Sequence, residues 1–147
     1  ETYGVDISEH AIEVARGRLG NSDVRVHDIL EAFPFPDAFF DVALVADVLE
    51  HVADPARAIR NISRTLRPGG LLYIASPNNN LVRQLVYKIP DHLEHHVSLM
   101  HIEEMAAWLR RLGYEIVEQW TSLNVTLKMR FSSAIGPEMS IIARRAE

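Results

Sequence analysis

The sequence contains no cysteine, which excludes disulfide bonds, thiolate metal ligands and cysteine nucleophiles. It has no excess of basic residues either: the formal net charge is −5 at pH 7, whereas a general nucleic-acid-binding protein presents a basic face. No apolar run approaches the roughly 20 residues that span a bilayer, and no signal-peptide pattern is present. We therefore expect a cytoplasmic protein that neither binds nucleic acid nor inserts stably into a membrane.

Apolar runs of strand length alternate with helical patterns along the 147 residues. This order is typical of an α/β fold, in which crossover helices cover a sheet. The predicted strands are residues 3–7, 24–27, 40–47, 71–76, 114–120 and 138–145. The run at 40–47 is almost continuously apolar, which predicts a strand covered on both faces. The charged end of the last run suggests an edge strand or a terminus. The sequence contains no linker or repeat, which predicts a single domain, 1–147.

Three helices are indicated by their caps and their apolar stripes. Ser8 is the expected N-cap of the first helix, and Asp54 followed by Pro55 starts the second. The second helix should bury Ile59, Ile62 and Leu66 and end at Pro68-Gly69-Gly70. A short amphipathic stretch at 81–86 precedes the third helix, whose stripe is Ile102, Met105, Leu109 and Leu112. No element is assigned between residues 121 and 137.

Acidic residues end the first two predicted strands, and the carboxyl ends of parallel strands are where open α/β sheets bind ligands. Asp6 could accept both hydroxyls of an adenosine ribose, or it could only stabilise the N-terminus of the next helix. Asp28 could accept the exocyclic amine of adenine while Ile29 packs on the ring, or it could only form an Asx-turn.

The stretch "ADVLEHV" follows the most apolar strand. Ala46, Asp47 and Val48 should face the ligand cleft there. Glu50 and His51 could act as an acid/base pair, although adjacent residues on a helix do not face each other. The alternative for His51 is a packing or capping residue at the start of the crossover.

Four histidines gather between residues 92 and 101. His92, His95 and His96 would share one face of a helix, and such a face can bind a metal ion. Pro90 makes a continuous helix doubtful and few acids lie nearby, so we expect no metal site. A general base that faces the substrate and a surface or capping histidine remain the two other interpretations.

The order and spacing of four segments are more specific than any single motif. These segments are "YGVDIS", "VHDILEAFPFPDAFFDVALVADVLEHVADP", "ISRTLRPGGLLYIASPN" and "HVSLMHIEEMAAWLRRLGYEIVE". Together they resemble the class I S-adenosylmethionine-dependent methyltransferases, and most closely the small-molecule branch that includes the quinone-biosynthesis enzymes. The resemblance implies a Rossmann-like sheet and S-adenosyl-L-methionine as cofactor.

The resemblance also implies roles for single residues. Asp6 matches the acid that holds the ribose hydroxyls, with Ile7 beside the adenine, and Asp28 with Ile29 matches the adenine-contacting pair. Ala46 and Val48 match positions that line the methionine moiety. His51 lies at the cleft mouth, residues 77–100 match the segment that covers the substrate, and His101 falls where the family often has a helix cap.

One family feature is absent from the sequence. The resemblance implies the strand order 3-2-1-4-5-7-6 and a glycine-rich loop after the first strand, yet none of the 7 glycines forms a G-x-G cluster. The first visible strand would then be the family's second, and its neighbour in the middle of the sheet would be missing. We therefore expect the sequence to be part of a longer chain without its N-terminal βα unit.

The expected activity is methyl transfer from S-adenosylmethionine to an O, N or C nucleophile of a small molecule. His51, His95 and His96 are the candidate bases if the nucleophile must lose a proton. Two alternatives remain open: a nicotinamide-dependent Rossmann oxidoreductase, and a non-catalytic methyltransferase-like module. A homo-oligomer is also compatible with the sequence.

Overall fold

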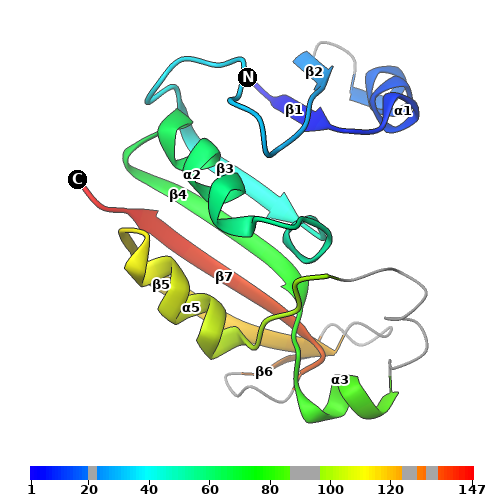
Figure 1. Cartoon of the computed structure of the whole chain (residues 1–147), viewed down its shortest axis with the longest axis vertical. Helices are drawn as coiled ribbons and strands as arrows, with labels where there is room; N and C mark the ends of the chain where they lie inside the picture. Colours follow the sequence, from blue (N-terminus) through cyan, green and yellow to red (C-terminus); the bar gives the residue numbers. More distant parts are fainter. Residues whose placement is uncertain (20–22, 87–96, 124–128, 132–135) are drawn as a thin grey trace.

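The computed structural model describes residues 1–147 except 20–22, 87–96, 124–128 and 132–135. Two β-sheets form, and they are not paired with each other in the described part of the chain (Figure 1). The small sheet contains the parallel strands β1 (Tyr3–Asp6) and β2 (Asp23–Val26), connected through helix α1 (Glu9–Leu19). The large sheet has the order β3-β4-β7-β5-β6.

The strands of the large sheet are β3 (Phe40–Ala46), β4 (Leu66–Pro77), β5 (Tyr114–Leu123), β6 (Met129–Phe131) and β7 (Glu138–Arg145). Only β3 and β4 are parallel; the other pairs are antiparallel. The remaining elements are the 3-10 helix η1 (Leu49–His51) and the helices α2 (Pro55–Thr65), α3 (Leu81–Val86) and α5 (Ile102–Arg111). This α/β architecture confirms the predicted fold class.

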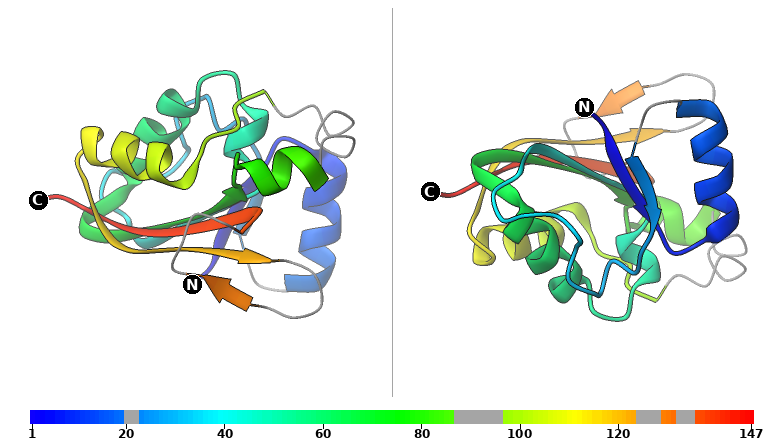
Figure 2. Two further views of the ribbon diagram at one scale, coloured as in Figure 1. Left: turned by 90° about the horizontal axis from the view of Figure 1, so that it is seen from below. Right: turned by 90° about the horizontal axis from the view of Figure 1, so that it is seen from above.

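Helices α2 and α5 cover one face of the large sheet, while α1 lies toward the opposite face (Figure 2). The core lies between the two helices and the sheet and is formed by apolar side chains that are at most 5% exposed. Its largest members are Leu49, Ile59, Leu66, Leu72, Ile74, Met105, Leu109, Met139 and Ile141. The stripes predicted for the second and third helices thus face the core, as expected for amphipathic helices.

The helix caps agree with the sequence. Ser8 Oγ accepts the backbone N–H of Ala11 at 3.2 Å, and Asp54 Oδ1 accepts that of Arg57 at 2.9 Å, with Pro55 at the first helical position. His101 caps α5 in a capping box, in which its Nδ1 accepts the N–H of Glu103. The capping interpretation of His101 is therefore confirmed.

The predicted end of the second helix is wrong by a few residues. Leu66 is fully buried as expected, but it begins β4 and pairs with Phe40 instead of extending α2. The pairing then shifts, so that Val42 is opposite Leu71, and the intervening residues bulge out of the ladder. A Cβ at Gly70 would lie 2.9 Å from a backbone oxygen, so this bulge requires glycine there.

Two expectations for the strands are refined. Strand β7 lies inside the sheet between β4 and β5, so the charged end of this last strand does not mark an edge, and of the two alternatives only the terminal position agrees. Strand β3 is covered on one face only: Val42 is 58% exposed and Leu44 is 69% exposed. The reason is that, among the described residues, α2 and α5 pack on the other face and only β4 pairs with β3.

The loop between β2 and β3 is held by arginines of α2. Arg64 donates to the carbonyl oxygens of Phe33 at 2.7 Å and Phe35 at 3.0 Å and pairs with Asp37. Beneath this loop, Tyr3 of β1 makes edge-to-face contacts with the rings of Phe35, Phe39 and Phe40, at centroid distances of 5.4–5.6 Å. This aromatic cluster connects the small sheet to the large one at the amino end of both β1 and β3.

The turn after β4 contains a buried polar centre, Asn78, which is 0% exposed. Its Nδ2 donates to the Gly136 carbonyl at 2.8 Å and its Oδ1 accepts the N–H of Ile102 at 3.0 Å. One amide thus connects the end of β4, the start of α5 and the entry to β7.

We predict that Asn78→Ala lowers the free energy of unfolding by about 2–4 kcal/mol, because the buried partners of its amide lose their hydrogen bonds. Urea denaturation followed by circular dichroism measures this change. Asn79→Ala is the matched control, because among the described residues the Asn79 side chain accepts an exposed bond from Gln84, and its loss should cost less than about 1 kcal/mol. Equal losses for the two variants would contradict the role of Asn78.

Candidate functional site

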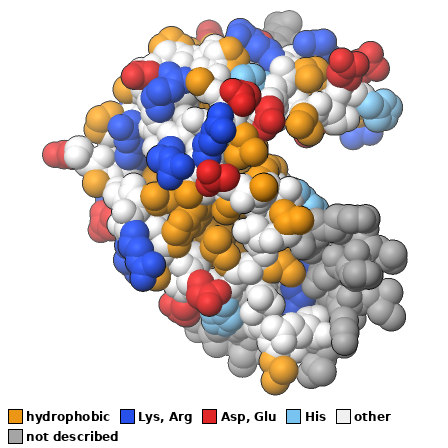
Figure 3. Space-filling view, viewed as in Figure 1, with side chains coloured by type: hydrophobic (Ala, Val, Ile, Leu, Met, Phe, Trp, Pro, Cys, Tyr) orange, Lys and Arg blue, Asp and Glu red, His pale blue; other side chains and the backbone are white. Residues whose placement is uncertain are grey.

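A cavity of about 790 Å³ lies between the two sheets. Its walls include all of β1, part of β3 and the loop between β2 and β3. Figure 3 shows the molecule hollowed between the small sheet and the main body, with hydrophobic side chains along the hollow. The carboxyl ends of β1, β2 and β3 all open on this cavity, which is where an open α/β sheet places its ligand.

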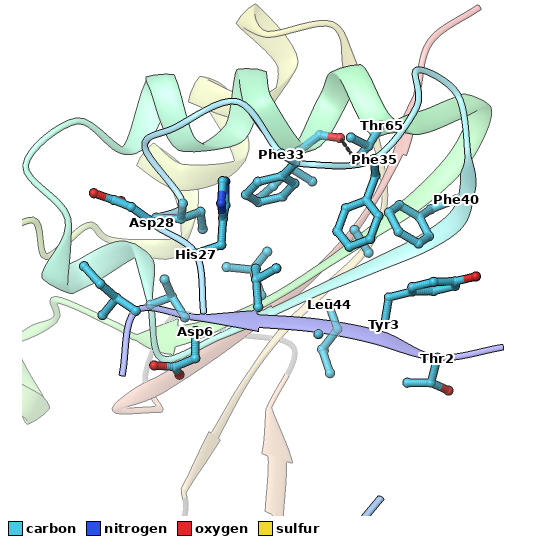
Figure 4. Close-up of a pocket in the computed structure, with 18 of the residues that line it drawn as sticks. Thr2, Tyr3, Asp6, His27, Asp28, Phe33, Phe35, Phe40, Leu44 and Thr65 are labelled. Atoms are coloured by element: carbon cyan, nitrogen blue, oxygen red, sulfur yellow. Dashed lines mark hydrogen bonds between the residues drawn. The ribbon is translucent and has the colours of Figure 1, made fainter. Parts of the chain in front are cut away.

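Two carboxylates occupy adjacent strand ends in the small sheet (Figure 4). Asp6 ends β1, and its Oδ1 accepts the N–H of Ser8 at 2.7 Å. Asp28 follows β2, and its Oδ1 accepts the N–H of Leu30 at 2.8 Å, which is an Asx-turn. One carboxylate oxygen of each acid therefore accepts a backbone N–H two residues further along the chain, and the second oxygen can accept a hydrogen bond from a ligand.

Apolar residues follow both acids. Ile7 is 71% exposed and lines the cavity, and Ile29, which is half-buried, lines it as well. Val48 and His51 also belong to the wall, at the other end of the site. Ala46 is exposed at the end of β3 but does not line the cavity.

Asp47 is placed in the cavity wall by an unusual backbone conformation. Its φ of 52° lies in the left-handed region, which is unfavourable for a residue with a side chain. Its N–H donates to the Ala75 carbonyl at 3.0 Å, so the pairing of β3 with β4 extends to this residue. With this conformation, Asp47 and the next residue, Val48, both line the cavity at the carboxyl end of β3.

Glu50 and His51 lie in different environments. Glu50 is 1% exposed, and its carboxyl accepts the hydroxyl of Ser76 at 3.1 Å, whereas His51 is exposed on the cavity side. The backbone oxygen of Glu50 accepts the N–H groups of Val97 at 2.8 Å and Ser98 at 3.0 Å. The carboxyl of Glu50 is therefore directed into the protein and His51 toward the site.

Burial raises the pKa of Glu50 above its ordinary value of 4.5, and the nearby Asp47 raises it further. The backbone N–H of Glu50 itself, the bond from Ser76 and the nearby His51 act in the opposite direction and lower the pKa. Burial also raises the pKa of Glu138, against the attraction of its ion-pair partner Arg83 at 2.8 Å. Acidic groups thus lie close together at this end of the sheet.

The other histidine candidates lie outside the described residues. His92, His95 and His96 fall within residues 87–96, so their role as bases or ligands stays a prediction. Part of the expected substrate-covering segment, 77–100, lies there too. In the part of the chain that the structure describes, no group of three potential ligands could hold a metal ion, and no helix is long and apolar enough to span a membrane.

Sequence reasoning missed three features of this site. The burial of Glu50 and the backbone of Asp47 have no signature in residue type or spacing. His27 lines the cavity and packs edge-to-face on Phe33 at 5.5 Å, while its Nε2 is buried without a hydrogen-bond partner among the described residues. Only its position directly before Asp28 could have drawn attention to it.

Comparison with known proteins defines the class of this fold and site. Residues 1–74 match the methyltransferase domain family. The chain is 30% identical over 128 residues to a ubiquinone biosynthesis O-methyltransferase from Aromatoleum aromaticum, which covers 78% of this chain and 55% of that protein. It is 34% identical over 90 residues to a ubiquinone/menaquinone biosynthesis C-methyltransferase from Pectobacterium carotovorum, covering 58% of this chain and 36% of that one.

A solved structure shares the fold of this chain over nearly its full length. The chain superposes with a TM-score of 0.79 and 22% identity on a methyltransferase from Thermotoga maritima described as a possible histamine N-methyltransferase, covering 97% of this chain and 72% of that one. The chain therefore belongs to the methyltransferase domain family, whose cofactor is S-adenosylmethionine. It spans about half the length of the ubiquinone O-methyltransferase it matches.

The raised pKa of Glu50 gives a prediction for stability against pH. The folded state holds a proton on Glu50 that the unfolded state releases above about pH 4.5, so stability should fall as the pH rises through the folded pKa. Glu50→Gln keeps the shape without the charge. We predict that it is more stable than the parent chain at pH 8 and that this advantage disappears toward pH 4.

Urea denaturation midpoints across this pH range measure the effect. Glu118→Gln, a change of the same kind at an exposed position of β5, is the control and should show no such trend. An advantage of Glu50→Gln that is independent of pH would show that charge burial is not its cause.

Proposed function

We propose that this chain binds S-adenosylmethionine in the cavity between the two sheets and serves methyl transfer to a small-molecule acceptor. The observation that carries the proposal is the pair of carboxylates, Asp6 and Asp28, on adjacent strand ends that face one cavity. A carboxylate matches the vicinal hydroxyls of a ribose, and a second one matches the exocyclic amine of adenine. Ile7 and Ile29 supply apolar surface for the purine ring between them.

The charge of the cavity fits this cofactor. Its charged lining residues are Glu1, Asp6, Asp28 and Asp47, and no lysine or arginine is among the lining residues that the structure describes. Such a wall favours a cationic ligand, and the cofactor carries a sulfonium. It disfavours a dinucleotide, whose diphosphate is negative, so the nicotinamide-dependent alternative is the weaker one.

The bound cofactor supplies a methyl group that is already activated by the positive sulfur. The chain then needs to align the acceptor, exclude water and, for some acceptors, remove a proton. His51 lies on the cavity wall and is our candidate for that proton transfer. Asp47 and Val48, which line the cavity, would position the methionine end of the cofactor at the carboxyl end of β3, whereas Ala46 lies outside the lining.

The acceptor is proposed as a small molecule, because the relatives described above are named as methyltransferases of ubiquinone or ubiquinone/menaquinone biosynthesis or as a possible histamine N-methyltransferase. Their names include O-, C- and N-methyltransferases, so the atom that receives the methyl group stays open. The non-catalytic alternative is tested by measuring the binding of S-adenosylhomocysteine to this chain. A chain that does not bind it would favour the non-catalytic module.

We predict that Asp6→Ala weakens binding of S-adenosylhomocysteine by about 1–3 kcal/mol, roughly 5- to 150-fold, because a charge-assisted hydrogen bond to the ribose is lost. Isothermal titration calorimetry measures the affinity. Glu13→Ala removes an equal charge from the exposed surface of α1 and should leave the affinity within about twofold. An unchanged affinity of Asp6→Ala would refute the ribose assignment.

We also predict that the chain discriminates S-adenosylhomocysteine from NAD, with NAD at least about tenfold weaker at low salt because its diphosphate meets only carboxylates. Raising the ionic strength should narrow the difference, since salt screens exposed charges. Competition against a fluorescent adenosine ligand measures both affinities. If NAD bound more tightly than S-adenosylhomocysteine, the result would contradict this prediction and favour the nicotinamide-dependent oxidoreductase.

A further inference from the structure

A side chain of helix α2 holds the turn that carries Asp28. Asn61, near the middle of α2, donates from Nδ2 to the carbonyl oxygens of Ile29 at 3.0 Å and Glu31 at 2.9 Å. Backbone carbonyls only accept hydrogen bonds, so it is the nitrogen of the Asn61 amide that faces this turn. The two N–H donors of the amide thus match two acceptors of the loop after β2.

The peptide unit between Ile29 and Leu30 continues this connection to the carboxylate. Its carbonyl accepts from Asn61, and its N–H donates to Asp28 Oδ1 at 2.8 Å. The C=O and N–H of a trans peptide point in opposite directions, so the unit lies between the amide and the carboxylate. Hydrogen bonds in such a chain strengthen one another. The position of the Asp28 carboxylate therefore depends on Asn61.

The turn itself is closed by local bonds. The N–H of Glu31 donates to the Asp28 carbonyl at 3.0 Å, which is the bond of a β-turn. Asp28 and Ile29 line the cavity, whereas Asn61 does not (Figure 4). Asn61 therefore acts on the cavity wall from behind, through the backbone of the turn.

The choice of asparagine at this position is not explained by the helix. Asparagine is a weaker helix former than alanine, and Asn61 is an interior residue of α2. It is half-buried, and its amide nitrogen serves the loop. The bonds to the turn offset the poor helix propensity, which indicates that this residue serves the loop and not the helix.

We propose that Asn61 is a positioning residue for the cofactor: it fixes the turn of residues 28–31 so that the second oxygen of Asp28 faces the exocyclic amine of adenine. Asn61 touches no ligand and acts through Asp28 and Ile29. This role rests on the proposed function. Discrimination between adenine and a purine with a carbonyl in place of the amine thus depends on a residue of α2.

The test compares S-adenosylhomocysteine with S-inosylhomocysteine, in which a carbonyl replaces the exocyclic amine, by isothermal titration calorimetry. The parent chain should prefer the adenosine ligand at least about tenfold, because the carboxylate of Asp28 accepts from an amine and repels a carbonyl oxygen. In Asn61→Ala, the affinity for S-adenosylhomocysteine should fall about 5- to 20-fold and the preference should narrow to less than about threefold. Alanine favours the helix, so a weaker α2 is not the cause of such a loss.

Two further variants serve as a check and a control. Asn61→Leu keeps a similar volume without donors or charge and should give the same result as alanine. Arg57→Ala removes an exposed bond from α2 to the side chain of Glu31 and leaves the backbone of the turn untouched. It should keep both affinities within about twofold.

A second measurement needs no ligand. Exchange of the Leu30 amide proton, followed by NMR on the 147-residue chain, should be at least about fivefold faster in Asn61→Ala and unchanged in Arg57→Ala. An unchanged rate in Asn61→Ala would overturn the hydrogen-bond chain. An unchanged affinity, or an equal loss for both ligands, would overturn the positioning role. If the parent chain bound neither ligand, the proposed function would fail, while faster Leu30 exchange would still support the connection from Asn61 to Asp28.

Discussion

The edge-to-face contacts between Tyr3 and three phenylalanines are the constraint on which the rest of the structure depends. Phe35, Phe39 and Phe40 hold β1 beside the large sheet at its amino end, in the absence of any ladder between the two sheets in the described residues. Such ring pairs contribute about 0.5–1.5 kcal/mol each. Because the attachment is at the amino end, the carboxyl ends remain apart, and the acids of the candidate site face an open cavity.

The same cluster depends on a polar contact made from the other side. Arg64 of α2 donates to two carbonyls of the loop that carries the phenylalanines. Its pairing with Asp37 is at the surface and contributes little by itself. The bonds to the carbonyls matter more, because they satisfy backbone groups of a loop with two prolines that cannot join a ladder. A surface helix thus determines the shape of a wall of the ligand cavity.

The sequence predicted the elements well and their environments less well. Caps at Ser8, Asp54 and His101 depend on local chemistry and were therefore predictable. The end of α2 was not predictable. Leu66 would be buried both as the last residue of the helix and as the first residue of β4, and only its pairing with Phe40 decides between the two. The acids at the strand ends could be located because strand ends meet at one edge; the burial of Glu50 depends on packing of distant segments and leaves no local pattern.

The two ends of the site therefore have different electrostatic characters. Asp6 is exposed, so water solvates its carboxylate in the free protein, and the donors of a ligand must replace that water on binding. Glu50 is buried beside Asp47, so its proton is favoured and its backbone oxygen anchors Val97 and Ser98. The end with Asp6 is thus open to water, whereas at the opposite end the backbone oxygen of Glu50 fixes Val97 and Ser98 beside the cavity.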